Sequence, residues 1–435
     1  MMPEREDDAG RVTTVGRLVG GAGPILELLL LPFVAVLLVG LLMPKGMALN
    51  GDPHVFFLRA IAVLAGRVPF RDFGSEYPPL SLLPMTLPHL WPNIDQGGFF
   101  ALLNAENGIL ASMIALTILW LSRRSWSSGG DSRALATWAL LILLMAPVAA
   151  WRFDLAASLL MMAGVVAAAA DRPGVAGVAL GLGALTKIFP LVVVPILAIR
   201  CLAKGDTRGA VRLVTACALT VGVGMLPFLV AAGPKALSFI DYQVVRGLQV
   251  ESAGGALVLL AHLLMPVTVS IEFLHQSFEV ASPLSTTVMS ALTPLALGLY
   301  GLLLIACWLR LRVERGTFGT VQNGTLVAYL AAALLAVMLT DRVLSPQYLL
   351  WVLPIGALLR RRQAYVLMAA CLLTVAIYPL GYDALLQQRP ELVMLLGARN
   401  LLLGVLLVWL LAGHAPIGRS RPRIEDQRTL VGAGS

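Results

Sequence analysis

Apolar runs recur along nearly the whole chain and are separated by short polar connections. The runs are about 15–25 residues long, which is the length of α-helix that crosses the hydrocarbon core of a bilayer. The alternating pattern of membrane β-barrel strands is absent from the sequence. The pattern therefore predicts an all-α protein, a polytopic integral membrane bundle of about 10–13 transmembrane helices.

The first apolar run, residues 25–43, is expected to be retained as a span. It lacks a small-residue cleavage site and leads into further apolar runs, unlike a removed signal peptide. The other clear spans are expected near residues 99–121, 134–150, 155–170, 211–232, 286–309, 325–340, 346–359, 364–380 and 398–413. The predicted domains are an N-terminal tail (1–24), a single transmembrane domain (25–413) and a basic C-terminal tail (414–435).

Short basic clusters between the apolar runs orient the chain, because Lys and Arg gather in the cytoplasmic loops of membrane proteins. The clusters are Arg123/Arg124/Arg133, Lys204/Arg208/Arg212, Arg310/Arg312/Arg315 and Arg360/Arg361/Arg362. Placing them in the cytoplasm puts both terminal tails there as well. The first long connection, residues 44–98, then lies on the outer face.

Residues 174–199 do not fit a single span, because basic residues flank the stretch on both sides. Its interior reads Thr-Lys-Ile-Phe-Pro, with Lys187 three residues before the helix breaker Pro190. Broken helices at membrane depth occur where they line a polar cavity. We therefore expect two short helices that meet at this break, with Lys187 facing a cavity. Residues 77–91 and 254–272 are each compatible with a span or an interfacial element.

Composition supports a membrane protein and excludes several classes. The chain is 58% hydrophobic and 13% charged, against about 25% charged residues in soluble domains. The net charge of +8 does not indicate nucleic-acid binding, because the basic residues sit in short clusters between spans. The phosphate-binding motif G-x-x-x-x-G-K-[ST] is absent. The four cysteines lack metal-type spacing and are expected to be buried and unpaired: Cys201, Cys217, Cys307 and Cys371.

The remaining charges concentrate where the chain is expected to reach the outer face. A charge at membrane depth costs about 2.5–3.5 kcal/mol and usually faces a cavity or a partner. Asp52 stands out as a lone carboxylate just after the first span, ahead of an expected amphipathic interfacial helix at 54–70. The other outer charges are Arg152/Asp154, the stretch 241–255, Asp341/Arg342 and, at the helix break, Lys187.

Each of these residues also has an ordinary structural interpretation, since Arg and Asp at a membrane interface often anchor helix ends. We favour that interpretation for Arg59, Arg67, Asp95 and Asp383. For Asp341 and Arg342, a local ion pair and a functional role are equally supported by the sequence. A functional role is favoured for Asp52, for Lys187 and for the polar, glycine-containing segment 246–252.

Several stretches, in this order, resemble the C superfamily of membrane glycosyltransferases, and most of all its family 87, which includes polyprenyl-phosphate-mannose-dependent mannosyltransferases. The first is an acidic residue, Asp52, followed by GRVPFRDFGSEYPPL. The others are RFDLAASLLMMAGVVAAA, AGVALGLGALTKIFPLVVVPILAIR and the pair RGLQVES and SPQYLLWVLP. Together they cover roughly residues 50–355.

The resemblance implies an enzyme of the C-type glycosyltransferase fold in the plasma (inner) membrane, with its active site on the extracytoplasmic side. It would transfer a sugar, with mannose as the first choice, from a polyprenyl-phosphate donor to a lipid-linked or cell-envelope glycan acceptor, with inversion. By position Asp52 would be the general base. Phosphate needs cations, and Lys187, Arg246 and Arg342 are the candidates. Candidate ligands of sugar or acceptor hydroxyls are Asp72, Glu76, Tyr77, Gln249 and Glu251.

Two other functions share these features. A transporter or lipid flippase also has intramembrane charges and broken helices, but the chain shows no second copy of the 44–98 loop. A ligase for a whole lipid-linked glycan would be expected to carry its charges in a late outer loop. No cofactor is expected, although a divalent cation is left open. The expected partners are the donor, the acceptor and membrane lipids, without nucleic acid.

Overall fold

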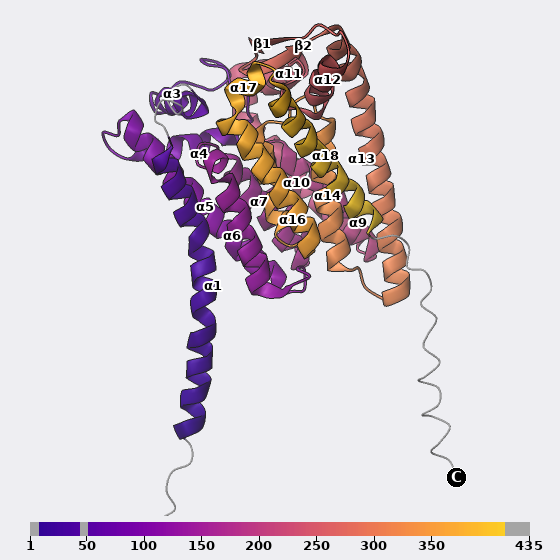
Figure 1. Cartoon of the computed structure of the whole chain (residues 1–435). Helices are drawn as coiled ribbons and strands as arrows, with labels where there is room; N and C mark the ends of the chain where they lie inside the picture. The colour runs from indigo at the N-terminus through magenta and orange to yellow at the C-terminus, as the bar shows by residue number, and fades with distance from the viewer. Residues whose placement is uncertain (1–7, 44–50, 414–435) are drawn as a thin grey trace, which may run out of the picture.

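The computed structural model describes residues 8–43 and 51–413, with side chains described from residue 23 onward. Within these residues, eight helices are long and apolar enough to cross a membrane. They are α1 (Asp8–Leu42, apolar over Gly23–Leu42), α5 (Gln96–Ser122), α6 (Gly130–Ala149), α10 (Thr207–Ala232, in a helical run that continues to Val245), α13 (Pro283–Phe318), α14 (Asn323–Thr340), α16 (Arg361–Val375, in a helical run that continues to Leu380) and α18 (Pro390–Ala412). The predicted all-α polytopic bundle is confirmed (Figure 1).

Shorter helices complete the bundle. They are α7 (Asp154–Ala169), α8 (Pro173–Thr186), η3 (Phe189–Val193) with α9 (Val194–Ala203), and η5 (Pro346–Tyr348) with α15 (Leu349–Gly356). The predicted break in 174–199 is present, because α8 ends at Thr186 and Lys187 is extended, with φ −158° and ψ 140°. A 14-residue helix such as α8 spans about 21 Å, against about 30 Å of hydrocarbon. A helix α8 that starts at the membrane surface would therefore place Lys187 within the hydrocarbon region, as the sequence predicts.

One end of the bundle carries a cap of short elements, which appears at the top of Figure 1. The cap consists of α3 (Asp52–Leu64), η4 (Gly233–Leu237), α11 (Ser238–Val245), α12 (Ala253–Leu264), β1 (Ser270–Leu274), β2 (Ser277–Ala281), η6 (Ala376–Leu380) and α17 (Tyr382–Leu386). Strands β1 and β2 form an antiparallel hairpin in which Ser270 pairs with Ala281. This hairpin was not predicted from the sequence.

Several sequence-level expectations change in detail. Residues 77–91 are no single span, because they form η1 (Pro79–Ser81), α4 (Leu82–Thr86) and η2 (Leu87–Leu90). The stretch 254–272 holds the 12-residue α12 and the start of the hairpin. The predicted helix over 54–70 ends at Leu64, since Gly66 takes φ +76° there. The start of the 44–98 loop, residues 44–50, and both tail ends (1–7 and 414–435) lie outside the described residues.

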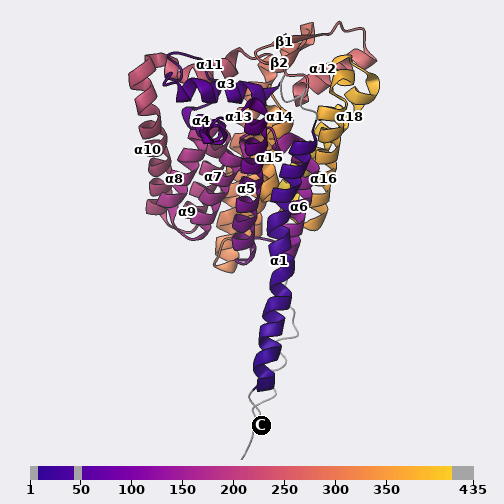
Figure 2. The ribbon, with the colours of Figure 1, turned by 90° about the vertical axis from the view of Figure 1, so that its left-hand side faces the viewer.

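The basic clusters meet at the end of the bundle opposite the cap. The guanidinium of Arg133 donates to the carbonyl of Leu359 (2.8 Å), and that of Arg315 donates to the carbonyl of Lys204 (2.7 Å). The amide of Asn323 likewise donates to the carbonyl of Arg124, at 3.1 Å. Helix α1 extends beyond this end, as Figure 2 shows. The arrangement has the charge asymmetry that the positive-inside rule describes.

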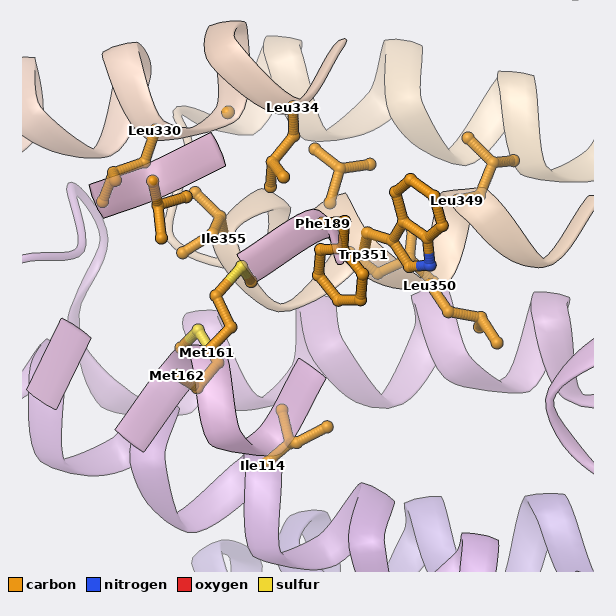
Figure 3. Close-up of a cluster of buried hydrophobic side chains, with 14 of the residues drawn as sticks. Ile114, Met161, Met162, Phe189, Leu330, Leu334, Leu349, Leu350, Trp351 and Ile355 are labelled. Atoms are coloured by element: carbon orange, nitrogen blue, oxygen red, sulfur yellow. The ribbon is translucent and has the colours of Figure 1, made fainter. Parts of the chain in front are cut away.

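The apolar core lies between the two ends and is built from α5, α7, η3, α14 and α15 (Figure 3). Met161, Phe189, Leu334 and Leu350 are buried there. The ring of Phe189 stacks on that of Trp351, with centroids 4.4 Å apart and planes within 2°. This stacking packs η3 against α15. The four cysteines are buried and free, as predicted.

Candidate active site

A cavity of about 520 Å³ lies between the cap and the bundle, at the end away from the basic clusters. Its walls come from α3, the 76–78 segment, the α6–α7 turn, the break at Lys187, the α11–α12 loop, the hairpin and η5. Seven residues singled out from the sequence line it: Asp52, Glu76, Tyr77, Lys187, Arg246, Gln249 and Glu251. The fold thus gathers side chains that are up to about 200 positions apart in sequence.

Asp52 is the first residue of α3, where a carboxylate is stabilised by the helix dipole. Pro53 follows it and suits the first turn, because its missing N–H would be unpaired there anyway. One oxygen of Asp52, Oδ2, lies 3.1 Å from Nη1 of Arg152. The Asp52 side chain is still 39% exposed, against 11% for Arg152. The carboxylate is therefore anchored on one side and accessible on the other.

A second charged pair lies deeper, at the helix break. Nζ of Lys187 is 2.7 Å from Oδ1 of Asp154, and the indole Nε1 of Trp351 donates to the same oxygen at 2.7 Å. Asp154 is fully buried and Lys187 nearly so. A buried charge of this kind persists only with a hydrogen-bonded partner. The pair therefore forms a fixed, polar floor to the cavity.

Aromatic rings surround the ammonium group of Lys187. The rings of Tyr77, Phe153, Tyr348 and Trp351 have centroids 5.1–5.6 Å from Nζ. Each distance is within the range of a cation–π contact, which favours the charged form of an amine. Tyr348 and Trp351 also stack on each other at 3.8 Å. The floor therefore combines a cation with flat apolar surfaces.

The α3 side of the cavity is held by an ion pair between Arg59 and Glu76, with Nη2 2.8 Å from Oε1. Arg59 is buried and Glu76 is partly exposed. Tyr77, the next residue, packs edge-on against Phe153 with centroids 4.9 Å apart. Arg59 also lines the cavity, and its Nη1 has no hydrogen-bond partner among the described residues. The structural role that was favoured for Arg59 stays a prediction.

The 246–252 segment forms the opposite wall. The amide of Gln249 donates to Oε2 of Glu251 and to Oγ of Ser345, both at 2.9 Å. Burial raises the pKa of Glu251 to about 7, against an ordinary value of 4.5. Its Oε1 has no hydrogen-bond partner among the described residues, and neither has Nε of Arg246. Both groups border the cavity and are available to a ligand.

Two predicted site residues do not line the cavity. Asp72 accepts hydrogen bonds from the N–H of Val68 (2.7 Å) and from Nε of Arg71 (2.9 Å). These bonds lower the pKa of this exposed carboxyl to about 2. Arg342 donates from Nη1 to the carbonyl of Val244, at 3.1 Å. Both residues thus stabilise loops beside the cavity.

The structure adds residues that the sequence did not assign to the site. Arg152 was noted only as an outer charge, yet it pairs with Asp52. Tyrosines from distant elements complete the lining: Tyr242, Tyr348, Tyr378 and Tyr382. The sequence Arg152–Phe153–Asp154 could have indicated that Arg152 belongs to the site, because two opposite charges beside an apolar run rarely occur without partners. The four tyrosines are isolated in the sequence, and no pattern around them indicates that they line a cavity.

No cluster of three or more His, Cys, Asp or Glu side chains in the described ranges is arranged to hold a metal ion. The ring of His54 contacts the amide of Gln96, with Nδ1 2.6 Å from Nε2. That contact gives His54 a structural partner. The expectation of no cofactor, with a divalent cation left open, stays a prediction.

No curated protein matches the chain at a significant level. A solved structure, the apo oligosaccharyltransferase of Archaeoglobus fulgidus, is similar with a TM-score of 0.43 at 14% identity. The similarity covers 90% of this chain and 55% of that chain.

The family model for glycosyltransferase family 87 matches residues 76–340, which is more than half of the chain. The matched residues include Glu76, Lys187 and the 246–252 segment of the cavity, whereas α3 with Asp52 lies before them and Tyr348 and Trp351 lie after them. With a match of this extent, the chain belongs to glycosyltransferase family 87.

Proposed function

We propose that this membrane glycosyltransferase transfers mannose from a polyprenyl-phosphate donor to a lipid-linked or cell-envelope glycan acceptor, with inversion at the anomeric carbon. The observation that carries the proposal is the carboxylate of Asp52, which is held by Arg152 yet exposed to the cavity. A general base needs both an oriented oxygen and access to the hydroxyl from which it takes a proton.

The proposed reaction is a single displacement. Asp52 accepts the proton of an acceptor hydroxyl as the hydroxyl oxygen forms a bond to the anomeric carbon. The bond between that carbon and the phosphate oxygen breaks, and the electron pair leaves with the polyprenyl phosphate. Phosphate leaves as a stable anion and needs no strong general acid, in contrast to the leaving alcohol of a glycosidase.

The cavity contains suitable cations for the developing charge on the phosphate. Arg246 borders the cavity with Nε unpaired, so it can donate to a phosphate oxygen. Lys187 lies deeper and supplies positive charge near the floor, with Asp154 as its counter-ion. Arg342, the third cation suggested by the sequence, faces a backbone carbonyl outside the cavity and has no place in this proposal.

The proposal places the active site on the extracytoplasmic side of the plasma membrane. The cavity lies at the end of the bundle opposite the basic clusters, and such clusters face the cytoplasm. A donor with a polyprenyl chain reaches that side within the membrane and needs no soluble nucleotide. Membership of a glycosyltransferase family favours transfer over the alternative, transport or flipping of a lipid-linked saccharide.

The direct test is a transfer assay with purified protein in lipid, using labelled polyprenyl-phosphate-mannose and membrane glycolipid acceptors. We expect transfer by the wild type and a loss of about 10²–10⁴-fold in Asp52→Asn, the usual contribution of a general base. Asp95→Asn is the matched control, because Asp95 caps α5 through the N–H of Gly98, and Asn caps equally well. Full activity of Asp52→Asn would contradict the assigned base.

A further inference from the structure

The turn between α6 and α7 connects the two charged pairs of the cavity. Helix α6 ends at Ala149 and α7 begins at Asp154. Within this turn Arg152 pairs with Asp52 of α3, and two residues later Asp154 pairs with Lys187 at the helix break. One short segment therefore holds both the proposed base and the deep cation.

Arg152 is fixed by more than the carboxylate it contacts. Its Nη1 also donates to the carbonyl of Trp151 (3.2 Å), and its Nη2 donates to the hydroxyl of Tyr378 (3.3 Å). These neutral acceptors orient the guanidinium plane without neutralising it. The carboxylate that Arg152 contacts directly is Asp52, whose side chain is otherwise part-exposed at the start of α3.

Phe153, between the two charged residues, connects the turn to both sides of the cavity. Its ring packs edge-on against Phe56 of α3 (5.6 Å between centroids) and against Tyr77 (4.9 Å). Phe153 and Phe56 are nearly inaccessible to solvent. Close-packed aromatic contacts of this kind resist displacement. The spacing between α3 and the turn is therefore fixed by packing as well as by charge.

We propose that Arg152–Phe153–Asp154 is a positioning element, in which Arg152 orients Asp52 and Asp154 orients Lys187. The inference rests on the proposed function, because it treats Asp52 as the base. A base and a phosphate-binding cation act on opposite sides of the bond that breaks, so their separation must be kept. A displacement of about 1 Å in such a pair can cost 100-fold in rate. Arg152 and Asp154 act through their partners and need not touch substrate.

The proposed orientation of Asp52 by Arg152 is tested by measuring kcat and donor KM in Arg152→Gln and Arg152→Lys. We expect Arg152→Gln to lower kcat by about 100-fold while donor KM stays within about threefold, because base orientation acts in the transition state. Arg152→Lys keeps the charge and should retain kcat within about tenfold of wild type. A merely structural Arg152 would lower the folded fraction and leave kcat per folded molecule unchanged.

The proposed orientation of Lys187 by Asp154 is tested in the same assay with Asp154→Asn. Releasing Lys187 from its anchor should raise donor KM by about tenfold, with a smaller change in kcat. If Asp154→Asn does not fold because a buried lysine loses its partner, Asp154→Glu carries the same test, since it keeps the charge and displaces the carboxylate by one methylene. Asp95→Asn again serves as the control.

The outcomes separate this inference from the proposed function. Normal kcat in Arg152→Gln together with an inactive Asp52→Asn would overturn the positioning role and leave the base assignment intact. The same holds if Arg152→Lys is no better than Arg152→Gln. An unchanged donor KM in folded Asp154 variants would overturn the proposed orientation of Lys187 by Asp154. Activity in Asp52→Asn would instead count against the proposed function itself.

Discussion

The two ends of the bundle each contain a cavity of similar size, about 520 Å³ under the cap and about 500 Å³ at the basic end. Each is bordered by a buried glutamate, Glu251 at the first and Glu314 at the second. The two carboxylates differ in how completely they are hydrogen-bonded. We therefore expect the incompletely bonded carboxylate to contact a ligand and the fully bonded one to stabilise the fold.

At the basic end, Glu314 is fully engaged. It accepts hydrogen bonds from Nε of Arg310 (3.0 Å), from the N–H of Gln322 (3.0 Å) and from the hydroxyl of Thr325 (2.5 Å). These contacts tie the end of α13 to the start of α14. A network with both oxygens satisfied rigidifies the protein and offers little to a ligand.

Under the cap the polar groups are incompletely paired. Atoms without a hydrogen-bond partner among the described residues include Oε1 of Glu251, Nε of Arg246, Nε of Arg152 and Oδ2 of Asp154. Leaving a buried polar group unpaired costs about 1–3 kcal/mol. A cluster of such groups is a feature that folding alone does not explain, and a polar substrate would satisfy it.

The largest test of this comparison exchanges each glutamate for glutamine. Glu251→Gln should lower kcat/KM for transfer by about 10–100-fold, because a hydrogen bond to a charged group is worth about 1.5–3 kcal/mol. Glu314→Gln should leave activity within about threefold but lower the free energy of unfolding by about 1–3 kcal/mol. Transfer assays and thermal unfolding in detergent measure the two effects. The comparison fails if Glu314→Gln is the less active variant.

A second test uses the pH dependence of stability. Burial raises the pKa of Glu251 to about 7 in the folded protein, from an ordinary value of 4.5. Between those values the folded state holds a proton that the unfolded chain has released, so stability falls as pH rises through this window. The loss is on the order of 3 kcal/mol. We expect the Tm difference between pH 5 and pH 8 to be smaller in Glu251→Gln than in wild type.

The smallest effect is expected at Asp72, which lies in the same outer loop as Asp52. Its bonds to Arg71 and Val68 and its exposed position indicate a role in the loop turn. Asp72→Asn should therefore keep transfer activity within about threefold. A loss comparable to that of Asp52→Asn in the same assay would show that the loop closes onto the substrate and would restore Asp72 to the site.

Residues close in sequence thus have different roles, and the sequence alone separated them poorly. Asp52 stood out as a lone carboxylate, but Asp72 in the same outer loop was also assigned to the site. The difference is that Asp52 begins a helix that packs over the α6–α7 turn, whereas Asp72 pairs with its own neighbour. An ion pair between neighbours in sequence can be predicted from their spacing along the chain. A pair between distant residues such as Asp52 and Arg152 depends on which helices pack together.

The sequence by itself determined the class of protein and several key positions. Apolar run length specifies a multi-pass helical bundle, because bilayer thickness sets the length of each helix locally. The basic clusters predict the orientation of the bundle through the charge of its loops. The Lys187 break was also predictable, since a charge and a proline within an apolar run admit few structures. Only the tertiary structure decided the partners of these residues. Hydrogen bonds across a cavity join side chains from distant helices, and helix packing sets which of them meet.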